Sequence, residues 1–425
     1  MKVLIIGSGG REHALAWKIA QSPLVKKIYC APGNPGIAAL AECVPLAVDR
    51  IDDLLAFAGE QSIDLTVVGP ELPLTLGIVD RFRAAGLTIF GPDQKAAQLE
   101  GSKAFSKELM AKYHIPTAAF ASFGDYSEAA AYVRSRGAPI VIKADGLAAG
   151  KGVYVTQTVE EALLALKEIL VDGTFGEAGR KVVVEEFLAG EEASFFAFTD
   201  GRNILPLAAC QDHKAAFDND SGPNTGGMGA YSPAPVVTPA LYDRIVAEVV
   251  RPTIAGMAAE GRPYRGILFI GLMISGERIR VLEYNVRFGD PETQPLLMRM
   301  KSDLVPVLLA CAKGHLEKER LEWHDQTAVC VVMASGGYPD SYREGFEIHG
   351  LEEAAGMDDL FVFHAGTALK DGRIVNNGGR VLGVTGLGRD VAAAIQRAYA
   401  GVAKISWDGV HYRHDIGRKA LSRRS

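Results

Sequence analysis

The sequence predicts a multi-domain protein of mixed α/β and α+β class, and three observations support this. Its 425 residues are enough for about three domains of roughly 150 residues each. The first hundred residues alternate β-branched runs with helical patterns, whereas the last hundred form a smaller α+β unit. With 48% hydrophobic and 23% charged residues, the composition is that of an ordinary globular protein.

The first hundred residues are expected to form a doubly wound parallel sheet. Strand patterns occupy residues 3–6, 27–31, 64–68 and 87–90, and helical patterns occupy 12–21, 51–60 and 76–85. Such alternation places helices on both faces of the sheet. Sites in these sheets form beyond the carboxyl ends of the strands, where this chain has loops at 7–12, 32–36, 69–71 and 91–92.

After Gly101 the regular alternation of strand and helix patterns ends. A helix is expected over 102–113, and residues 116–188 then combine strands with two amphipathic helices. Strands at 139–143 and 151–156 should form a hairpin. Further strands are expected at 181–186, 193–199, 266–275, 278–285, 328–334, 361–367 and 381–385, with helices at 160–170 and 391–402.

Charge and cysteine content exclude several classes of protein. The net charge of −6, without blocks of Lys and Arg, argues against nucleic acid as a partner. The apolar runs are too short for a membrane span or a signal peptide. The five cysteines are far apart, which favours reduced thiols in the cytoplasm. We expect a monomer, because no heptad repeat suggests an obligate partner.

The first glycine-rich loop, at 7–12, favours a phosphate monoester over a dinucleotide. The dinucleotide fingerprint needs a third glycine where this chain has Glu12, and no carboxylate ends the second strand to hold a ribose hydroxyl. Backbone N–H groups at a helix N-terminus still suit an anion, and Arg11 adds positive charge. The alternative is a structural tight turn.

The second glycine-rich loop, at 143–152, is expected to close over the phosphates of a nucleotide. It departs from a Walker A motif, because three residues separate Gly146 from Gly150 and Gly152 stands where Ser or Thr would bind magnesium. A glycine hairpin flanked by two lysines can nevertheless cover phosphates held between two sheets. The alternative is a solvated hairpin tip.

Two acidic segments add to this prediction. Residues 182–192 read as a buried strand that can offer main-chain groups to adenine and a carboxylate to ribose, although acidic strand ends are common. On the strand at 281–287, Glu283, Asn285 and Arg287 share one face and the intervening residues Leu282, Tyr284 and Val286 the other. Hard oxygens at 283 and 285 suit Mg²⁺. The alternative is a surface strand with scattered charge.

A third glycine-rich segment spans residues 212–233. Long loops inside compact domains are usually functional or mobile. His213 is a candidate base, but an ordinary hydrogen-bonded histidine is the simpler interpretation.

Four motifs together resemble those of the phosphoribosylamine-glycine ligases, a family of the ATP-grasp superfamily. They are Gly7-Ser8-Gly9-Gly10-Arg11-Glu12-His13-Ala14, Lys143-Ala144-Asp145-Gly146-Leu147-Ala148-Ala149-Gly150-Lys151-Gly152, Gly222-Pro223-Asn224-Thr225-Gly226-Gly227-Met228-Gly229 and Asn285-Val286-Arg287-Phe288-Gly289-Asp290-Pro291-Glu292. The resemblance runs from residue 1 to about 417. Val286 departs from the family pattern, where Cys is frequent, but it should point away from the metal.

The resemblance implies a pre-ATP-grasp domain over 1–101, a larger ATP-grasp half with the metal site over 102–115 and 191–325, a lid over 116–190 and a C-terminal domain over 326–425. It also implies the cofactors ATP and Mg²⁺, or Mn²⁺ in its place. The implied reaction joins glycine to 5-phosphoribosylamine through glycyl phosphate and gives glycinamide ribonucleotide, a step of purine biosynthesis.

The family's functional residues carry over to matching positions. The residues expected to contact ATP are Lys103, Lys143, Gly150, Lys151, Gly152, Glu185, Glu186, Phe187, Leu188 and Glu192. Those expected to bind the metal are Glu283 and Asn285. The residues expected to contact the substrates are Gly9, Gly10, Arg11, Glu71, Asp212, Lys214, Gly227 and Arg287. Arg287, Lys151 and Asp212 are the catalytic candidates: Arg287 should position the glycine carboxylate, and Asp212 is a candidate proton acceptor.

Three alternatives stay open. Another carboxylate-amine ligase would share the ATP site, and only the segments 212–233 and 285–292 argue against it. A dinucleotide-dependent oxidoreductase would use the first hundred residues, against which the failed glycine fingerprint weighs. A non-catalytic nucleotide sensor is disfavoured because the lysine and Glu-Asn sets are intact.

Overall fold

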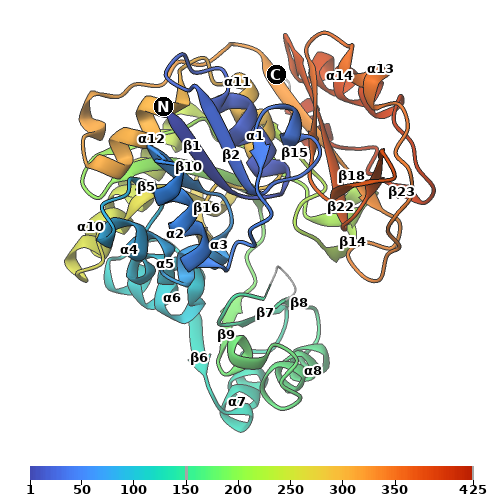
Figure 1. The fold of residues 1–425 in the computed structure, drawn as a ribbon. Coiled ribbons are helices and arrows are strands. Elements are labelled where there is room, and N and C mark those ends of the chain that lie inside the picture. Colours follow the sequence, from blue (N-terminus) through green and yellow to red (C-terminus); the bar gives the residue numbers. More distant parts are fainter. Residues whose placement is uncertain (149–151, 424–425) are drawn as a thin grey trace.

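The computed structural model describes residues 1–148 and 152–423 and confirms the mixed α/β and α+β architecture. Figure 1 shows the N-terminal sheet in blue, the C-terminal sheet in orange and red beside it, and a smaller cyan and green lid below both. No helix among the described residues is long and apolar enough to cross a membrane, and the five cysteines are unpaired.

The N-terminal sheet is fully parallel, with the strand order β3-β2-β1-β4-β5. Its strands are β1 (Lys2–Gly7), β2 (Lys27–Pro32), β3 (Glu42–Cys43), β4 (Leu65–Val68) and β5 (Ile89–Phe90). Its helices are α1 (Gly10–Ile19), α2 (Ile51–Glu60), α3 (Glu71–Thr75), α4 (Ile78–Ala84) and α5 (Gln94–Gly101). The helix predicted over 76–85 is confirmed as α4, which begins at Ile78 because Gly77 before it adopts a left-handed conformation (φ 86°). The short helix α3 was not predicted.

Alternate residues of β1 pack on opposite faces of this sheet. Val3 and Ile5 belong to one hydrophobic core, and Leu4 and Ile6 belong to another. Both cores continue into the larger ATP-grasp half: the core of Val3 and Ile5 includes Phe269, and the core of Leu4 and Ile6 includes Val281. The N-terminal sheet and the larger half therefore share their interiors, which fixes the loops of one against the strands of the other.

The lid is a four-stranded antiparallel sheet with its own hydrophobic core. It contains β6 (Phe120–Phe123), β7 (Ile140–Ala144), β8 (Val153–Thr156), β9 (Val182–Glu186), α7 (Tyr126–Arg136) and α8 (Val159–Leu170). Asp125 and Thr158 cap the two helices by accepting backbone N–H groups. Strands β7 and β8 pair antiparallel, as the hairpin prediction requires.

The larger half is built on the antiparallel sheet β11-β10-β16-β17. Its strands are β10 (Glu191–Asp200), β11 (Ile204–Pro206), β16 (Arg265–Ser275) and β17 (Arg278–Asn285), with a hairpin of β13 (Ala215–Phe217) and β14 (Ser221–Asn224) nearby. Its helices are α6 (Lys103–Lys112), α9 (Pro239–Ile245), α10 (Arg251–Ala259), α11 (Thr293–Arg299) and α12 (Leu304–Lys313).

The C-terminal sheet draws two strands from outside its expected range. It consists of β12 (Gln211–Asp212), β15 (Gly229–Ser232), β18 (Thr327–Ser335), β19 (Leu360–His364), β22 (Arg380–Gly388) and β23 (Val410–His411). A hairpin of β20 (Thr367–Lys370) and β21 (Arg373–Asn376) and the helices α13 (Leu351–Ala355), α14 (Val391–Val402) and α15 (Arg418–Leu421) complete it. Strands β12 and β15 lie within 191–325, the range assigned to the larger half. The strand predicted over 361–367 ends at His364.

Two histidines lie buried where the N-terminal and C-terminal domains meet. The backbone N–H of His364 in β19 donates to Nδ1 of His13 in α1 over 2.8 Å. Asn34 donates to the carbonyl oxygens of both Ser8 and His364, at 2.7 and 3.0 Å. Because Nδ1 of His13 must accept this hydrogen bond, the imidazole has to be neutral.

Acid should weaken this contact. Burial lowers the pKa of His13 to about 3 and that of His364 to about 4, whereas a free histidine titrates near 6.5. The unfolded chain therefore binds these protons more tightly, and the free energy of unfolding falls as the pH drops from about 6.5 towards 3. We expect His13→Gln, whose amide oxygen can accept the same N–H, to lose less of its urea midpoint between pH 7 and 5 than the wild type. Equal losses would contradict this.

Candidate active site

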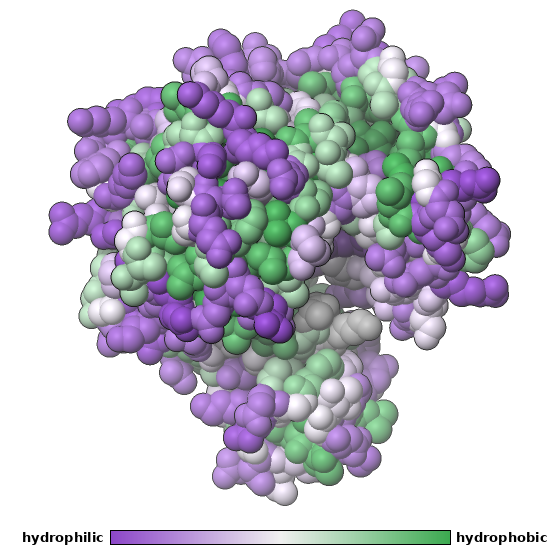
Figure 2. Space-filling view, viewed as in Figure 1, coloured by the Kyte–Doolittle hydropathy of each residue, from purple (hydrophilic) through white to green (hydrophobic). Residues whose placement is uncertain are grey.

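One cavity of about 510 Å³ lies where the units meet and collects most of the predicted site residues. Figure 2 shows the surface notched between the lid and the C-terminal domain. The cavity is lined from the N-terminal domain by Arg11, Glu71 and Glu100, from the lid by Lys143, Gly152 and Glu185 to Leu188, from the larger half by Lys103, Lys107, Glu192, Asp212, Lys214, Glu283, Asn285, Arg287 and Glu292, and from the C-terminal domain by Arg380.

A buried carboxylate holds two lysines at the cavity wall. Glu185 Oε2 lies 2.8 Å from Lys107 Nζ, and Glu185 Oε1 lies 2.9 Å from Lys143 Nζ. The three side chains are at most 7% exposed. The Glu185 carboxylate therefore positions Lys107 and Lys143, and its contact with the nucleotide stays a prediction. Burial lowers the pKa of Lys107 to about 8, against the opposing attraction of Glu185.

Lys103 stands at the first residue of α6, beside the lid. Ser102 caps this helix by accepting the N–H of Phe105 over 3.1 Å. Asp145, which directly follows β7, accepts the backbone N–H of Ala104 over 2.7 Å, so the start of α6 is tied to the lid. Lys103 Nζ donates to the carbonyl oxygen of Gly146, 3.0 Å away. Its ammonium group thus lies next to the glycine hairpin.

The predicted metal ligands share one wall of the cavity. Lys214 Nζ lies 3.0 Å from Glu192 and 3.4 Å from Glu283. Its charge, against burial and with smaller contributions from Lys143 and Lys103, lowers the pKa of Glu283 to about 2, so this carboxylate is ionised. An ionised carboxylate beside the amide oxygen of Asn285 is a donor set that fits Mg²⁺, which usually takes one or two protein groups plus phosphates.

The predicted alternation along β17 does not hold at Leu282 and Tyr284. The register with β16 shifts between Gly271 and Leu272, which leaves a bulge at Leu282. Leu282 was expected on the far face, but it lines the cavity, and its carbonyl oxygen accepts from Lys143 Nζ over 3.2 Å. Tyr284, also expected on the far face, contributes to the cavity lining as well, although its hydroxyl bonds Thr253 in the interior, 2.7 Å away.

Arg287 is held from both sides by acids. Its Nε donates to Glu71 over 3.0 Å, and its Nη2 lies 3.3 Å from Glu100 and 3.1 Å from Asn285 Oδ1. Nη1 donates to the carbonyl oxygen of Phe288 over 3.2 Å. Four acceptors thus face five N–H donors, which leaves one donor for a ligand. Glu71, predicted to hold a ribose phosphate, serves here as a partner of Arg287.

The first glycine loop is closed by its own glutamate. Glu12, 2% exposed, accepts the N–H of Gly9 over 2.6 Å and pairs with Arg11 Nε at 2.5 Å. A Cβ at Gly69 would lie 2.0 Å from Glu12 Oε1, so the carboxylate fills the space beside the loop. Arg11 Nη1 also donates to the carbonyl oxygen of Phe288 over 3.1 Å. The Gly9 N–H and the Arg11 charge are both engaged within the protein.

Asp212 and Glu292 are two buried carboxyls at the cavity wall. Glu292 Oε1 accepts the hydroxyl of Ser194 over 2.9 Å. Burial, opposed by Lys214 and reinforced by the neighbouring Glu292, raises the pKa of Asp212 well above its usual range. Asp212 therefore takes up a proton more readily than an exposed aspartate would.

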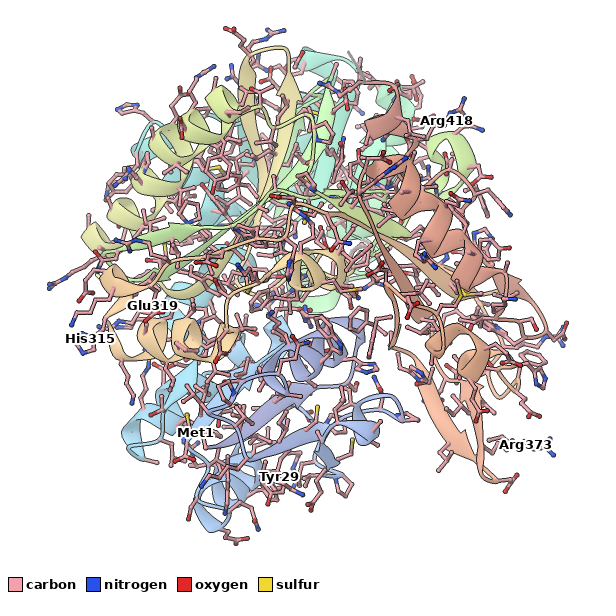
Figure 3. All side chains as sticks on the ribbon, turned by 90° about the horizontal axis from the view of Figure 1, so that it is seen from above. Met1, Tyr29, His315, Glu319, Arg373 and Arg418 are labelled. Carbon is pink, nitrogen blue, oxygen red and sulfur yellow. The ribbon has the colours of Figure 1, made fainter. Side chains whose placement is uncertain are left out.

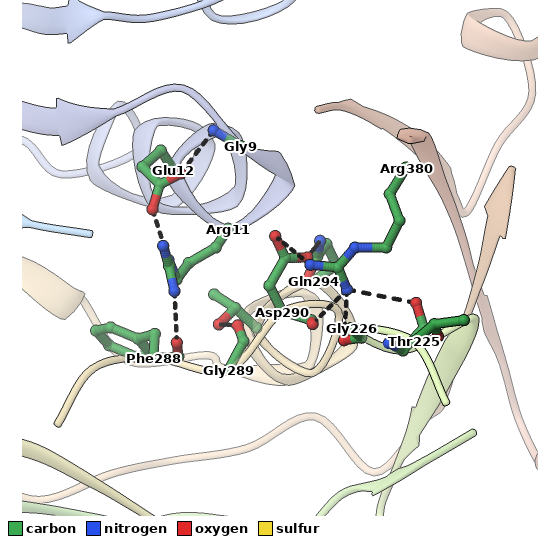
Figure 4. A network of polar contacts seen from close by, with 12 residues as sticks. Gly9, Arg11, Glu12, Thr225, Gly226, Phe288, Gly289, Asp290, Gln294 and Arg380 are labelled. Atoms are coloured by element: carbon green, nitrogen blue, oxygen red, sulfur yellow. Dashed lines mark hydrogen bonds and ion pairs between the residues drawn. The ribbon is translucent and has the colours of Figure 1, made fainter. Parts of the chain in front are cut away.

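The C-terminal domain contributes Arg380 to the cavity wall, a residue that was not predicted from the sequence. Figure 4 shows Arg380 between Asp290 and the chain at Gly226. Gly227 requires its glycine, because φ is +114° and a Cβ would lie 2.5 Å from Pro291. Arg380 gave no local signal, since its neighbours in the cavity lie far away in sequence.

The remaining predicted site residues differ in where they lie. Gly150 and Lys151 lie outside the described residues. Glu186 accepts the N–H of Ala119 over 2.9 Å, and Phe187 is 41% exposed at the cavity edge. Gly10 lies against Gln294, whose Nε2 would be 2.6 Å from a Cβ at that position. The sequence did not identify four of the residues that line the cavity, namely Lys107, Glu100, Asp290 and Glu292. Only Lys107 had a recognisable signal in the sequence, because it follows Lys103 by one helical turn.

Comparisons with known proteins agree with this architecture. Three family profiles match the chain: the phosphoribosylglycinamide synthetase N domain over 1–100, its ATP-grasp (A) domain over 101–293 and its C domain over 328–419. A phosphoribosylamine-glycine ligase of Vibrio vulnificus is 57% identical over 426 aligned residues, covering 100% of this chain and 99% of the relative.

Solved structures show the same fold. The crystal structure of a phosphoribosylamine-glycine ligase from Thermotoga maritima is 36% identical, with a TM-score of 0.84 over 98% of this chain and 100% of that one. A biotin carboxylase domain of Hydrogenobacter thermophilus 2-oxoglutarate carboxylase, in complex with MgADP, is 16% identical, with a TM-score of 0.73 over 97% and 91% of the two chains. This second likeness shows the fold alone.

The sequence resemblance is thereby confirmed over the whole chain, and the protein belongs to the phosphoribosylamine-glycine ligase family of ATP-grasp ligases.

Proposed function

We propose that this protein joins glycine to 5-phosphoribosylamine at the expense of ATP and yields glycinamide ribonucleotide, ADP and phosphate in purine biosynthesis. One observation carries the proposal: a single cavity brings Lys103 and Lys143 together with the ionised Glu283 and with Asn285. Positive side chains and metal ligands of this kind are what phosphoryl transfer requires, because the reaction depends on positioning and charge stabilisation. The full-length relatives carry the name of this ligase.

The reaction needs an activated carboxylate. A glycine carboxylate oxygen attacks the γ-phosphorus of ATP, the bond to ADP breaks, and glycyl phosphate forms. The amine of phosphoribosylamine then attacks the acyl carbon, phosphate leaves, and the nitrogen loses a proton. Lys103 and Lys143 neutralise the phosphoryl oxygens, while the buried carboxyl of Asp212 accepts the proton. No covalent intermediate with the protein is required.

The remaining roles follow from the cavity walls. Glu283 and Asn285 hold Mg²⁺ or Mn²⁺, which when bound neutralises phosphate charge. Apolar side chains of the lid and the larger half, including Val155, Leu188 and Met273, form the slot for adenine, with Glu185 to Leu188 at its edge and Glu192 towards the ribose. Closing the lid over the cavity would keep water from glycyl phosphate.

The sugar substrate is placed at the N-terminal end of the cavity. Arg11, Glu71 and Lys214 line the cavity, Gly9 and Gly10 lie against Asp290, and Gly227 lies against Pro291. Arg287 would meet the glycine carboxylate. The monomeric state and the cytoplasmic location also stay predictions.

Phosphate release from MgATP tests the function. We expect turnover only when glycine and freshly prepared phosphoribosylamine are both present, and none when alanine replaces glycine or when the metal is chelated. Turnover with another acid and amine, but not with this pair, would keep the ATP-grasp ligase and overturn the substrates. Tight NAD binding in calorimetry would instead revive the oxidoreductase alternative, against which the buried Glu12 argues.

Arg287→Lys tests the glycine site. A lysine cannot keep the contacts to Glu71, Glu100 and Asn285 and still present an N–H to a carboxylate. The glycine KM should rise roughly 10- to 100-fold, the cost of one charge-assisted hydrogen bond. ATP affinity, measured by calorimetry on the same variant, should stay nearly unchanged. Loss of ATP binding with an unaltered glycine KM would contradict the assignment.

A further inference from the structure

Arg380, at the first residue of β22, reaches from the C-terminal domain into the cavity. Its Nη1 donates to the carbonyl oxygens of Gly226 and Asp290, each 2.6 Å away, and of Gly227 at 3.3 Å. A Cβ at Gly226 would lie 2.9 Å from Arg380 Cζ, so the chain at Gly226 packs directly on the guanidinium. Arg380 is thus fixed by one of its three nitrogens.

The other two nitrogens of Arg380 keep their hydrogen-bonding capacity. Neither Nε nor Nη2 has a hydrogen-bond partner among the described residues, and the ion pair from Nη2 to Asp290 Oδ2 spans 3.6 Å. The side chain is 22% exposed and lines the cavity. By contrast, five other cavity cations have carboxylate partners at 2.5 to 3.0 Å, namely Arg11, Lys107, Lys143, Lys214 and Arg287.

The surroundings of Arg380 identify the end of the cavity it serves. Asp290 Oδ1 accepts from Gln294 over 2.9 Å, and a Cβ at Gly9 would lie 3.4 Å from Asp290 Oδ2. Burial alone would raise the pKa of Asp290, but the charges of Arg380 and Arg11 outweigh it and keep this carboxylate ionised. Arg380 and Asp290 therefore lie beside the first glycine loop (Figure 4).

We propose that Arg380 binds the phosphate of the sugar substrate through Nε and Nη2. The two N–H groups on one edge of a guanidinium match two oxygens of a phosphate monoester. Arg11, which the sequence favoured for this role, already uses Nε for Glu12 and Nη1 for the carbonyl oxygen of Phe288, and its side chain is 9% exposed against 22% for Arg380. The inference rests on the proposed function and adds that the C-terminal domain supplies the anchor of the sugar phosphate.

Calorimetry with two stable probes tests the inference: glycinamide ribonucleotide and the corresponding nucleoside, which lacks the phosphate. Wild-type protein should bind the nucleotide more tightly than the nucleoside. Arg380→Gln should weaken nucleotide binding roughly 10- to 100-fold, the effect of a lost charge-assisted bond, and change nucleoside binding less than about twofold. The control Arg373→Gln removes a charge from an exposed hairpin at the outer end of the same domain and should keep the wild-type ratio (Figure 3).

Two results would overturn the inference. An unchanged ratio of nucleotide to nucleoside affinity would show that the phosphate lies elsewhere, and an equal loss for both probes would show that Arg380 acts only by holding Gly226 and Gly227. If Arg380→Gln does not fold, Arg380→Lys serves instead, because one ammonium cannot keep three carbonyl contacts and a bidentate phosphate, and the ratio should still fall. Wild-type protein that neither ligates nor binds the nucleotide would remove the proposed function, and this inference with it.

Discussion

Buried carboxylates that hold cations in place are the interaction on which the rest of this site depends. Glu185 holds Lys107 and Lys143, while Glu71 and Glu100 hold Arg287. Taken out of water alone, a lysine would lose its charge and an arginine would leave the cavity, because an unpaired buried charge is very costly. The paired acids let several positive groups stay fixed and charged around an empty space, ready for a triphosphate. Preorganised charge of this kind is what phosphoryl transfer requires.

The domain arrangement keeps these charges at fixed distances from one another. The N-terminal sheet and the larger half share two hydrophobic cores, so Arg11 and Glu71 cannot move independently of β17. The C-terminal sheet takes in β12 and β15 from the larger half, which carries Asp212 directly to the edge of that sheet. The lid has a core of its own, so it can move against the other units without breaking a shared interior. The C-terminal sheet also has its own core, but Phe363 of β19 packs into a core that includes residues of the N-terminal sheet.

Most of the fold and part of the site could be predicted from the sequence. The helices over 51–60 and 391–402 occur at their predicted bounds, because their hydrophobic patterns are regular. Local patterns do not encode which distant strands pair, so the transfer of β12 and β15 to the C-terminal sheet was missed. The same limit applies to Arg380, whose partners are more than 80 residues away in sequence. Motifs placed Glu283 and Asn285 on the cavity wall, but they did not reveal that Glu71 and Glu185 pair with cations inside the protein.

ATP binding by Glu185→Gln is the most direct measurement of the central claim. If Glu185 preorganises Lys107 and Lys143, removing its charge leaves two lysines that repel each other, and ATP affinity in calorimetry should fall at least about tenfold, as for a lost charge-assisted contact. Glu160→Gln, on the exposed side of the lid helix α8, is the matched control and should bind ATP as the wild type does. Unchanged or tighter ATP binding in Glu185→Gln would mean that net positive charge alone attracts the nucleotide, and it would contradict the account.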